Sequence, residues 1–200
     1  MKRLLSLQSS LFGAEGASGK LSEGFIARLQ KNHPGLKITH RDLNQDPVPH
    51  LNAETFSGFS LDANERNASQ QQAAQLSDQL IEELKDSDTI VLGLPMYNFG
   101  IPSTLKAWMD HIARAGVTFR YGENGPEGLL TGKKLYVIAT RGGQYAGTPA
   151  DTQTEFVRNL FSFVGIRDIE FIYAEGLAMS DIREQSLSQA ETLLNKKAAA

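Results

Sequence analysis

The chain has 200 residues, 40% of them hydrophobic, a formal net charge of −3 and no cysteine. Its length suits a single domain whose core is large enough to need no covalent crosslinks. Without cysteine there is no disulfide framework, thiolate metal site or thiol redox couple, so any redox chemistry must belong to a bound cofactor. The basic residues form no dense cluster, and the apolar runs are too short to span a bilayer. We therefore expect a cytoplasmic protein that contacts neither nucleic acid nor a membrane.

Strand and helix patterns alternate five times along the chain. Short apolar runs predict strands at Arg3–Gln8, Leu36–Arg41, Thr89–Pro95, Leu135–Thr140 and Ile169–Ala174. Apolar residues at helical spacing predict helices over about 21–32, 73–84, 103–116, 155–164 and 182–197. Gly116 has the residue type of a C-cap and is expected to end the third of these helices. This alternation implies a doubly wound parallel α/β sheet with right-handed crossovers.

Two segments leave this alternating plan. Residues 47–72 form a polar stretch opened by two prolines and rich in asparagine and glutamine, where we expect only short helical pieces. Residues 117–131 lie between the third and fourth strands; Val117–Tyr121 alternates like a half-exposed strand, and Gly122–Gly128 is typical of a turn cluster. We expect both segments to be excursions from one domain that covers residues 1–200.

The loop after the first strand, residues 9–18, has the composition of a phosphate site. It carries hydroxyls and glycines and leads into a helix N-terminus, whose free N–H groups and partial positive charge attract anions. No Lys or Arg lies between Arg3 and Lys20, so N–H groups and hydroxyls would hold a phosphomonoester that stays bound. The Walker A and G-x-G-x-x-G patterns are both absent from this loop. The alternative is an ordinary turn in which Ser18 only caps the helix.

The loops after the third and fourth strands would emerge at the same edge of the sheet. Met96–Phe99 presents two aromatic rings and an amide, which either suit a flat ring with polar edges or simply cover the core. Gly142–Gly143 either lets the backbone approach a ligand and point N–H groups at its negative charge, or forms an ordinary glycine turn. Arg141 either contacts a ligand or lies in solvent.

Other catalytic arrangements are missing from the sequence. It contains no G-x-S-x-G elbow of the kind that carries the nucleophile of serine hydrolases. The four histidines are scattered without the i,i+3 or i,i+4 spacing of a zinc site, so we expect no metal. His111 is interpreted as a surface or interface residue.

Four motifs together resemble the bacterial FMN-dependent NADH:azoreductases. They are Ser9-Ser10 with the Gly/Ser loop that follows, Pro95–Phe99, Ala115–Tyr121 continued by Glu123–Leu129, and Arg141–Gly143. The resemblance runs from the first strand to the last helix, and its two middle motifs are long and specific. It implies a flavodoxin-like fold with strand order 2-1-3-4-5, bound FMN, a homodimer, and NADH or NADPH as the source of hydride.

Carried over position by position, the resemblance assigns a cofactor site, to which we add a hypothetical substrate pocket. The FMN phosphate would be held by Ser10, Gly16, Ala17 and Ser18. The ribityl chain and the ring would be lined by Met96, Tyr97, Asn98 and Phe99. The pyrimidine end would be bordered by Thr140, Arg141, Gly142 and Gly143. The pocket over the ring would be walled by Phe99, Phe119, Tyr121 and Phe163.

One departure from the family pattern concerns the phosphate loop. Gly16 and Ala17 stand where relatives often have hydroxyl or amide side chains, so backbone N–H groups would carry more of the phosphate affinity. The excursion that contains Phe119 and Tyr121 is a candidate surface for contact with the partner subunit.

The implied reaction is a two-electron transfer in ping-pong order. NADH or NADPH would pass hydride to the flavin N5 and leave, and a quinone or an aromatic azo compound would take its place, with no catalytic side chain required. Two alternatives stay open: an FMN electron carrier or regulatory module without NAD(P)H oxidase activity, and a flavin-free binding protein of the same fold. FMN electron carriers tend to be strongly acidic, whereas the net charge of −3 in this chain is mild, which argues against the first alternative.

Overall fold

The computed structural model describes residues 1–199 and has five parallel strands in one sheet. The strands are β1 (Arg3–Gln8), β2 (Lys37–Asp42), β3 (Thr89–Pro95), β6 (Lys134–Thr140) and β7 (Asp168–Ala174). They lie in the order β2-β1-β3-β6-β7, and every neighbouring pair is parallel. Because β4 and β5 form a separate hairpin, this is the predicted order 2-1-3-4-5, and the predicted doubly wound α/β fold is confirmed.

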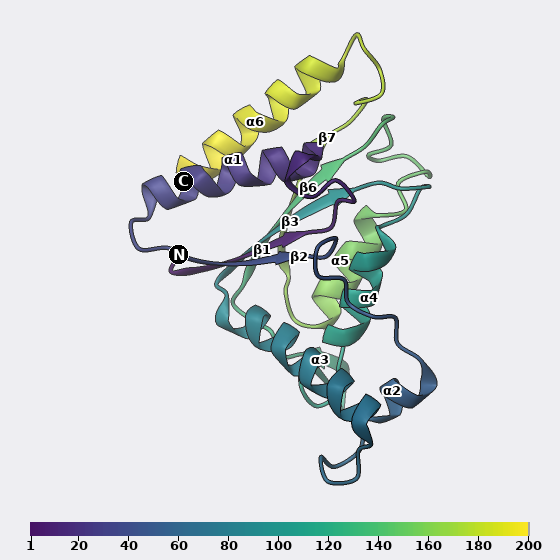
Figure 1. The fold of residues 1–200 in the computed structure, drawn as a ribbon. Coiled ribbons are helices and arrows are strands. Elements are labelled where there is room, and N and C mark those ends of the chain that lie inside the picture. The colour runs from purple at the N-terminus through teal and green to yellow at the C-terminus, as the bar shows by residue number, and fades with distance from the viewer. Residues whose placement is uncertain (200) are drawn as a thin grey trace.

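Helices cover both faces of the sheet (Figure 1). One face carries α1 (Ala17–Asn32) and α6 (Arg183–Ala199), and the other carries α3 (Ala68–Asp86), α4 (Ser103–Ile112) and α5 (Thr154–Phe163). Each face has its own apolar core. β3 is buried along its whole length because it lies in the middle of the sheet and is covered from both sides. Within residues 1–199 no helix has the length and apolar character needed to cross a membrane.

Local sequence signals set several of the element ends. β3 stops at Pro95, which has no N–H for a further ladder bond. α3 begins with a capping box, in which Asn67 Oδ1 accepts from Gln70 N at 3.0 Å and Gln70 Oε1 accepts from Asn67 N at 2.9 Å. The polar segment 47–72 contains only the short α2 (Ala53–Ser57) and the first turn of α3.

The end of α4 differs from the prediction. The helix stops at Ile112 and not at Gly116, because Thr118 Oγ1 donates to Ile112 O at 2.6 Å and accepts from Arg114 N at 2.9 Å. These two bonds turn the chain away from the helix axis one turn early. Gly116 lies in the turn that follows, with a φ of +78° that suits glycine.

The excursion after α4 also has more structure than the sequence indicated. β4 (Phe119–Gly122) pairs antiparallel with β5 (Gly125–Gly128), so the expected turn cluster contains a strand. Strand pairing here overrides the weak strand preference of Gly-Pro-Glu-Gly. The base of the hairpin packs on the C-terminal end of α5, where Leu130 N donates to Val164 O at 2.8 Å. This contact places the hairpin at the N-terminal edge of the sheet, beside the start of β6.

Candidate active site

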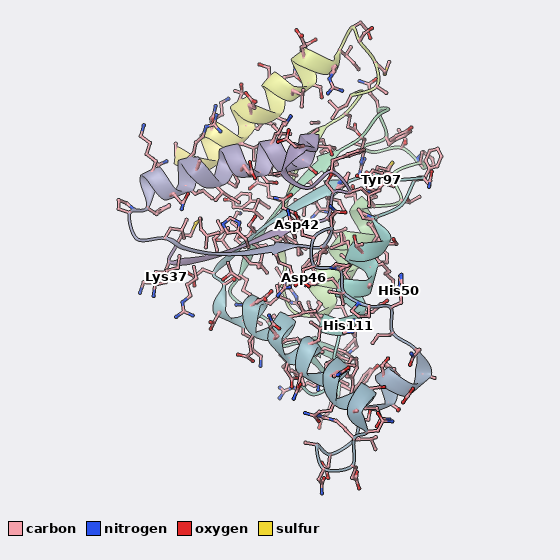
Figure 2. All side chains as sticks on the ribbon, in the orientation of Figure 1. Lys37, Asp42, Asp46, His50, Tyr97 and His111 are labelled. Carbon is pink, nitrogen blue, oxygen red and sulfur yellow. The ribbon has the colours of Figure 1, made fainter. Side chains whose placement is uncertain are left out.

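The loop after β1 is tied to the neighbouring strand and to the loop after β3. Ser9 Oγ donates to Gly93 O in β3 at 2.6 Å, and Ser9 and Ser10 are both buried. The Leu11 N–H donates to the hydroxyl oxygen of Tyr97 at 3.1 Å. Figure 2 places Tyr97 at the edge where the strands end, while His50 lies lower, on the side of α4. The loops after β1 and β3 therefore lie side by side at the same edge of the sheet.

α1 begins without a side-chain cap at the position where the sequence indicated a phosphate. Its N-cap is Gly16, which has an extended backbone and offers no side chain, so the first N–H groups of α1 have no capping partner. The Ser18 hydroxyl is buried and finds no hydrogen-bond partner in residues 1–199. Ser18 therefore does not cap the helix, and the interpretation as an ordinary capped turn is wrong.

These groups fit a phosphate monoester. Free N–H groups at the positive end of a helix attract an anion, and a buried hydroxyl without a partner has a donor to give. The short 3-10 helix η1 (Gly13–Glu15) closes the loop so tightly that a Cβ at Gly19 would collide with Gly13 O. Lys20 pairs with Glu15 at 3.2 Å, and both side chains are exposed. The loop thus brings N–H and O–H donors to the site and turns its lysine toward a carboxylate.

The loop after β3 forms a tight turn with a strained backbone. Tyr97 and Gly100 exchange backbone hydrogen bonds of 3.1 and 2.9 Å, and Asn98 and Phe99 between them have φ values of +49° and +60°. The left-handed region costs a non-glycine residue about 1–2 kcal/mol, and strain of this kind is typical of functional sites. Phe99 is 57% exposed, and its ring meets Tyr145 edge-on with 5.7 Å between centroids. Phe99 therefore does not cover the core, and its ring is accessible from outside the protein.

The loop after β6 presents two free N–H groups. Gly142 O accepts from Ala178 N at 3.0 Å and Gly143 O accepts from Gly176 N at 2.9 Å, so both carbonyls are satisfied within the protein. In the described part of the chain, neither glycine N–H donates to a protein atom. A Cβ at Gly143 would lie 2.7 Å from the Tyr145 ring, so a larger residue there would require Tyr145 to move. Adjacent backbone donors of this kind bind and stabilise negative charge.

The bases of these two loops are joined directly. Met96 N donates to Thr140 O at 3.0 Å, and Pro95 lies opposite Thr140 in the parallel register. The structure therefore brings all twelve residues expected around the cofactor to one edge of the sheet: Ser10, Gly16, Ala17, Ser18, Met96, Tyr97, Asn98, Phe99, Thr140, Arg141, Gly142 and Gly143.

Arg141 differs from the other eleven, because its side chain is buried inside the protein and does not lie in solvent. Its side chain is fully buried, and its guanidinium pairs with Asp151 at 2.7 Å and with Glu175 at 3.0 Å. Its backbone is also occupied, since its N–H donates to Ala174 O and its carbonyl accepts from Leu177 N. A buried cation is tolerated only with paired carboxylates, and these partners draw the Arg141 side chain into the protein.

The Asp151 carboxylate is held in its ionised form by this cluster. Burial raises the pKa of Asp151, but hydrogen bonds from Arg141 and Thr154 lower it more, so its pKa lies below the ordinary value. The Thr154 hydroxyl donates to Asp151 at 2.7 Å and the Thr154 N–H donates at 3.1 Å. The buried positive charge of Arg141 is thus matched by a carboxylate that is itself fully hydrogen-bonded.

The expected substrate pocket is not assembled within one chain. Phe119 and Phe163 pack with 4.2 Å between ring centroids, and Tyr121 lies beside them and is 76% exposed. Phe163 is the last residue of α5, whereas the residues just before α5 contact the turn that carries Phe99. A helix of 10 residues is about 15 Å long, so Phe99 lies at the other end of α5 from this aromatic group.

Two residues that contact the site were missed in the sequence. Gln153 is fully buried, and its Nε2 donates to Pro95 O at 2.9 Å and to Gly100 O at 3.0 Å. The Thr152 hydroxyl donates to Phe99 O. Neither belongs to a recognisable motif; the available signal was their position, directly between an expected binding loop and a helix.

His111 is buried at 2% exposure and is not the surface residue that the sequence indicated. Its Nδ1 lies 3.0 Å from Ala107 O, and burial lowers the pKa of its imidazole. Across residues 1–199, no three His, Asp or Glu side chains come together in a way that would hold a metal ion.

Comparison with known proteins identifies the family. A family model described as the flavodoxin-like fold matches residues 2–198. The chain is 49% identical over 195 residues to FMN-dependent NADH:quinone oxidoreductase 2 of Pseudomonas fluorescens. The aligned region covers 97% of this chain and 98% of the relative. This chain belongs to the FMN-dependent NADH:quinone oxidoreductase family. The FMN-dependent NADH:quinone oxidoreductase of Cellvibrio japonicus is 47% identical over 200 residues, with both chains fully covered.

Solved structures agree with this family. An azoreductase from Bacillus anthracis superimposes with a TM-score of 0.91 at 26% identity, covering 99% of both chains. An FMN-dependent NADH-azoreductase from the same species, crystallised in complex with FMN, gives a TM-score of 0.86 at 26% identity and covers 99% of this chain and 100% of that one. The predicted family and its flavodoxin-like fold are confirmed.

If this family member binds phosphate at Ser18, replacing Ser18 by alanine should have two opposite effects. The flavin-free protein should gain about 1 kcal/mol in the free energy of unfolding, because an unsatisfied buried hydroxyl disappears. The Kd for FMN should rise by about tenfold, because a donor to the phosphate is lost. Urea unfolding and FMN titration measure the two quantities.

Ser22→Ala is the matched control, since Ser22 is also buried on α1 with an unpartnered hydroxyl but lies one turn further from the helix start. It should share the gain in stability and leave the Kd unchanged. Equal effects of the two substitutions on FMN affinity would remove Ser18 from the phosphate site.

Asp151→Asn should lower the free energy of unfolding at about pH 7 by about 3 kcal/mol, because buried Arg141 loses a charged partner. Since folding lowers the pKa of Asp151, its stabilisation is fully present above about pH 4 and is lost as the pH falls through the folded-state pKa. The difference between parent and variant should therefore shrink toward about pH 2. Urea unfolding across this range measures it, with exposed Asp181→Asn as control. A difference that does not change with pH would contradict the ionic pairing.

Proposed function

We propose that residues 1–200 work as one FMN-binding domain and that the protein is an oxidoreductase that takes hydride from NADH or NADPH. Quinones and aromatic azo compounds accept the electrons, two at a time and in ping-pong order. The observation that carries this proposal is the meeting of three loops at one sheet edge: an uncapped helix start, an aromatic turn and a pair of free N–H groups. The names of its relatives, NADH:quinone oxidoreductase and azoreductase, support both acceptor classes.

Each loop has a separate task in this proposal. The start of α1 binds the FMN phosphate through backbone N–H groups, the Ser18 hydroxyl and the neighbouring Ser10. The Tyr97–Gly100 turn lines the ribityl chain and one face of the ring, with Met96 and Thr140 at its base. The Gly142 and Gly143 N–H groups donate to the polar pyrimidine end of the ring.

FMN supplies the hydride chemistry when it is bound, and the protein supplies position and electrostatics. Fixed N–H donors at Gly142 and Gly143 stabilise negative charge at the ring edge without reorganising, which favours transfer of two electrons together. The exposed Phe99 ring and its neighbour Tyr145 give the space beside the turn an aromatic wall. No side chain has to move a proton, because solvent reaches the open edge of the sheet.

A homodimer in the cytoplasm is part of this proposal. Phe119 and Phe163 lie at the far end of α5 from Phe99, and Tyr121 leaves a large aromatic surface exposed beside them. An exposed aromatic next to a packed aromatic pair suits burial against a partner protein. We propose that this aromatic group on one subunit completes the substrate pocket over the flavin of the other.

The function is tested on purified recombinant protein. We expect a yellow protein that oxidises NADH in the presence of menadione, with the parallel double-reciprocal lines of a ping-pong reaction. A protein that stays colourless after incubation with excess FMN would overturn the proposal. A yellow protein without NADH oxidation would instead be the electron carrier or regulatory module.

Tyr121→Ala should lose turnover and keep bound FMN, since Tyr121 belongs to the substrate pocket and not to the cofactor site. Mixing this variant with Gly16→Asp, whose carboxylate repels the phosphate, tests which subunit supplies Tyr121. After dissociation and random reassociation, we expect about a quarter of the parent activity, because half of the dimers then hold one complete site of two. A mixture no more active than its two components would place Tyr121 outside the partner's pocket.

A further inference from the structure

Gln153 lies between the two loops that would face the flavin ring, and every hydrogen-bonding group of its amide is used. Nε2 donates to Pro95 O at 2.9 Å and to Gly100 O at 3.0 Å, and Oε1 accepts from Arg141 Nε at 3.3 Å. Arginine nitrogens only donate and backbone carbonyls only accept. The amide therefore has one orientation that satisfies all three partners.

The carbonyls that Gln153 binds belong to the two arms of the strained turn. Pro95 ends β3 on one side of the turn, and Gly100 closes the other side. The Thr152 hydroxyl donates to the carbonyl of Phe99 at the tip. Because Asn98 and Phe99 both have left-handed backbone angles, the turn persists only where surrounding contacts over-determine its shape. Residues 152 and 153 supply such contacts from outside the turn.

The same cluster reaches the free N–H groups of the loop after β6. Arg141 directly precedes Gly142 and is held by Asp151 and Glu175. Glu175 Oε1 also accepts from Tyr145 N and Ala146 N, both at 2.9 Å. One buried polar network thus fixes the turn after β3 and the loop after β6 against each other.

We propose that Gln153 is a positioning residue that forms the Tyr97–Gly100 turn before FMN arrives, and that Arg141 orients its amide. The inference rests on the proposed FMN function and adds a residue that acts through the turn without facing the ligand. A turn that is already formed binds more tightly, because the cofactor does not have to order it. Gln153 therefore sets the affinity for FMN from behind the site.

Two substitutions of similar size separate donation to the turn from acceptance of the Arg141 hydrogen bond. Gln153→Met removes all three hydrogen bonds without adding charge. Gln153→Glu keeps an acceptor for Arg141 but turns a carboxylate oxygen toward the carbonyls of Pro95 and Gly100. Gln30→Glu, on the exposed side of α1, is the control for the change in charge. Thr152→Val, at an exposed position, removes the single bond to Phe99 O and keeps the test available if a Gln153 variant does not fold.

Hydrogen exchange in the full-length, flavin-free protein reads the turn directly. We expect the Tyr97 and Gly100 N–H groups to exchange at least about tenfold faster in both Gln153 variants, and less so in Thr152→Val, with α6 unchanged. FMN titration should give Kd values that rise in the order parent, Gln153→Met, Gln153→Glu, the first increase being about tenfold. Gln30→Glu should match the parent in both measurements.

The outcomes that overturn the inference are specific. Faster exchange in α6 as well as in the turn would indicate a general loss of stability in place of a local role. Parent-like exchange and FMN affinity in Gln153→Glu would mean that only the acceptor for Arg141 matters. If Thr152→Val leaves both the hydrogen exchange of the turn and the affinity for FMN unchanged, then residues 152 and 153 do not stabilise the turn as proposed. If the parent itself binds no FMN, the proposed function fails, while the exchange measurements still decide whether Gln153 forms the turn.

Discussion

Parallel pairing of β1, β3 and β6 determines where this protein can bind a cofactor. Gln8 pairs with Gly93 and Pro95 pairs with Thr140, so the three strands end close together. Their loops leave the sheet at one edge, while helices cover both of its faces. Leu11 N and the Tyr97 hydroxyl, 86 residues apart, are hydrogen-bonded as a result. The position of the candidate site is thus a consequence of strand register, because this register brings the separate loop motifs close enough to contact one ligand.

The candidate site at this edge is built from backbone donors and hydroxyls in place of charged side chains. α1 offers uncapped N–H groups beside the free Ser18 hydroxyl, and Gly142 and Gly143 offer two more donors. Backbone donors are already oriented by the fold, whereas a lysine or arginine would lose side-chain freedom on binding. The consequence is that affinity depends on the shape of the loops, and a small displacement of backbone would matter more here than at a site held by flexible cations.

The sheet, its strand order and the loops that meet at its edge could be predicted because their signals are local. Buried parallel strands are near-continuous apolar runs, and binding loops follow such strands. The end of α4 could not be predicted in the same way. Gly116 carried the stronger local signal, but the bonds of Thr118 to Ile112 and Arg114 decide the end, and they form only when the chain folds back.

Residues whose role depends on distant partners were the ones that sequence reasoning misplaced. Arg141 precedes two glycines, a position that suggested contact with a ligand. Its side chain instead pairs with Asp151 and Glu175, which lie 10 and 34 residues further along the chain. Phe119 and Phe163 were grouped correctly with each other, because their chemistry is evident, but the length of α5 separates them from Phe99. Residue types and their order do not reveal that Phe163, at the end of α5, lies far from a loop that contacts the start of α5.

The buried charges and the strained turn belong to one arrangement. A buried ion pair adds little net stability, because the loss of hydration offsets the attraction between the charges. Stability alone is therefore a poor reason for the cluster of Arg141, Asp151 and Glu175, and apolar side chains could fill the same volume. They could not, however, orient the amide of Gln153. The carboxylates hold Arg141, Arg141 donates to Gln153, and Gln153 donates to both arms of the strained turn. In the role proposed for Gln153, the cluster therefore maintains the shape of the turn.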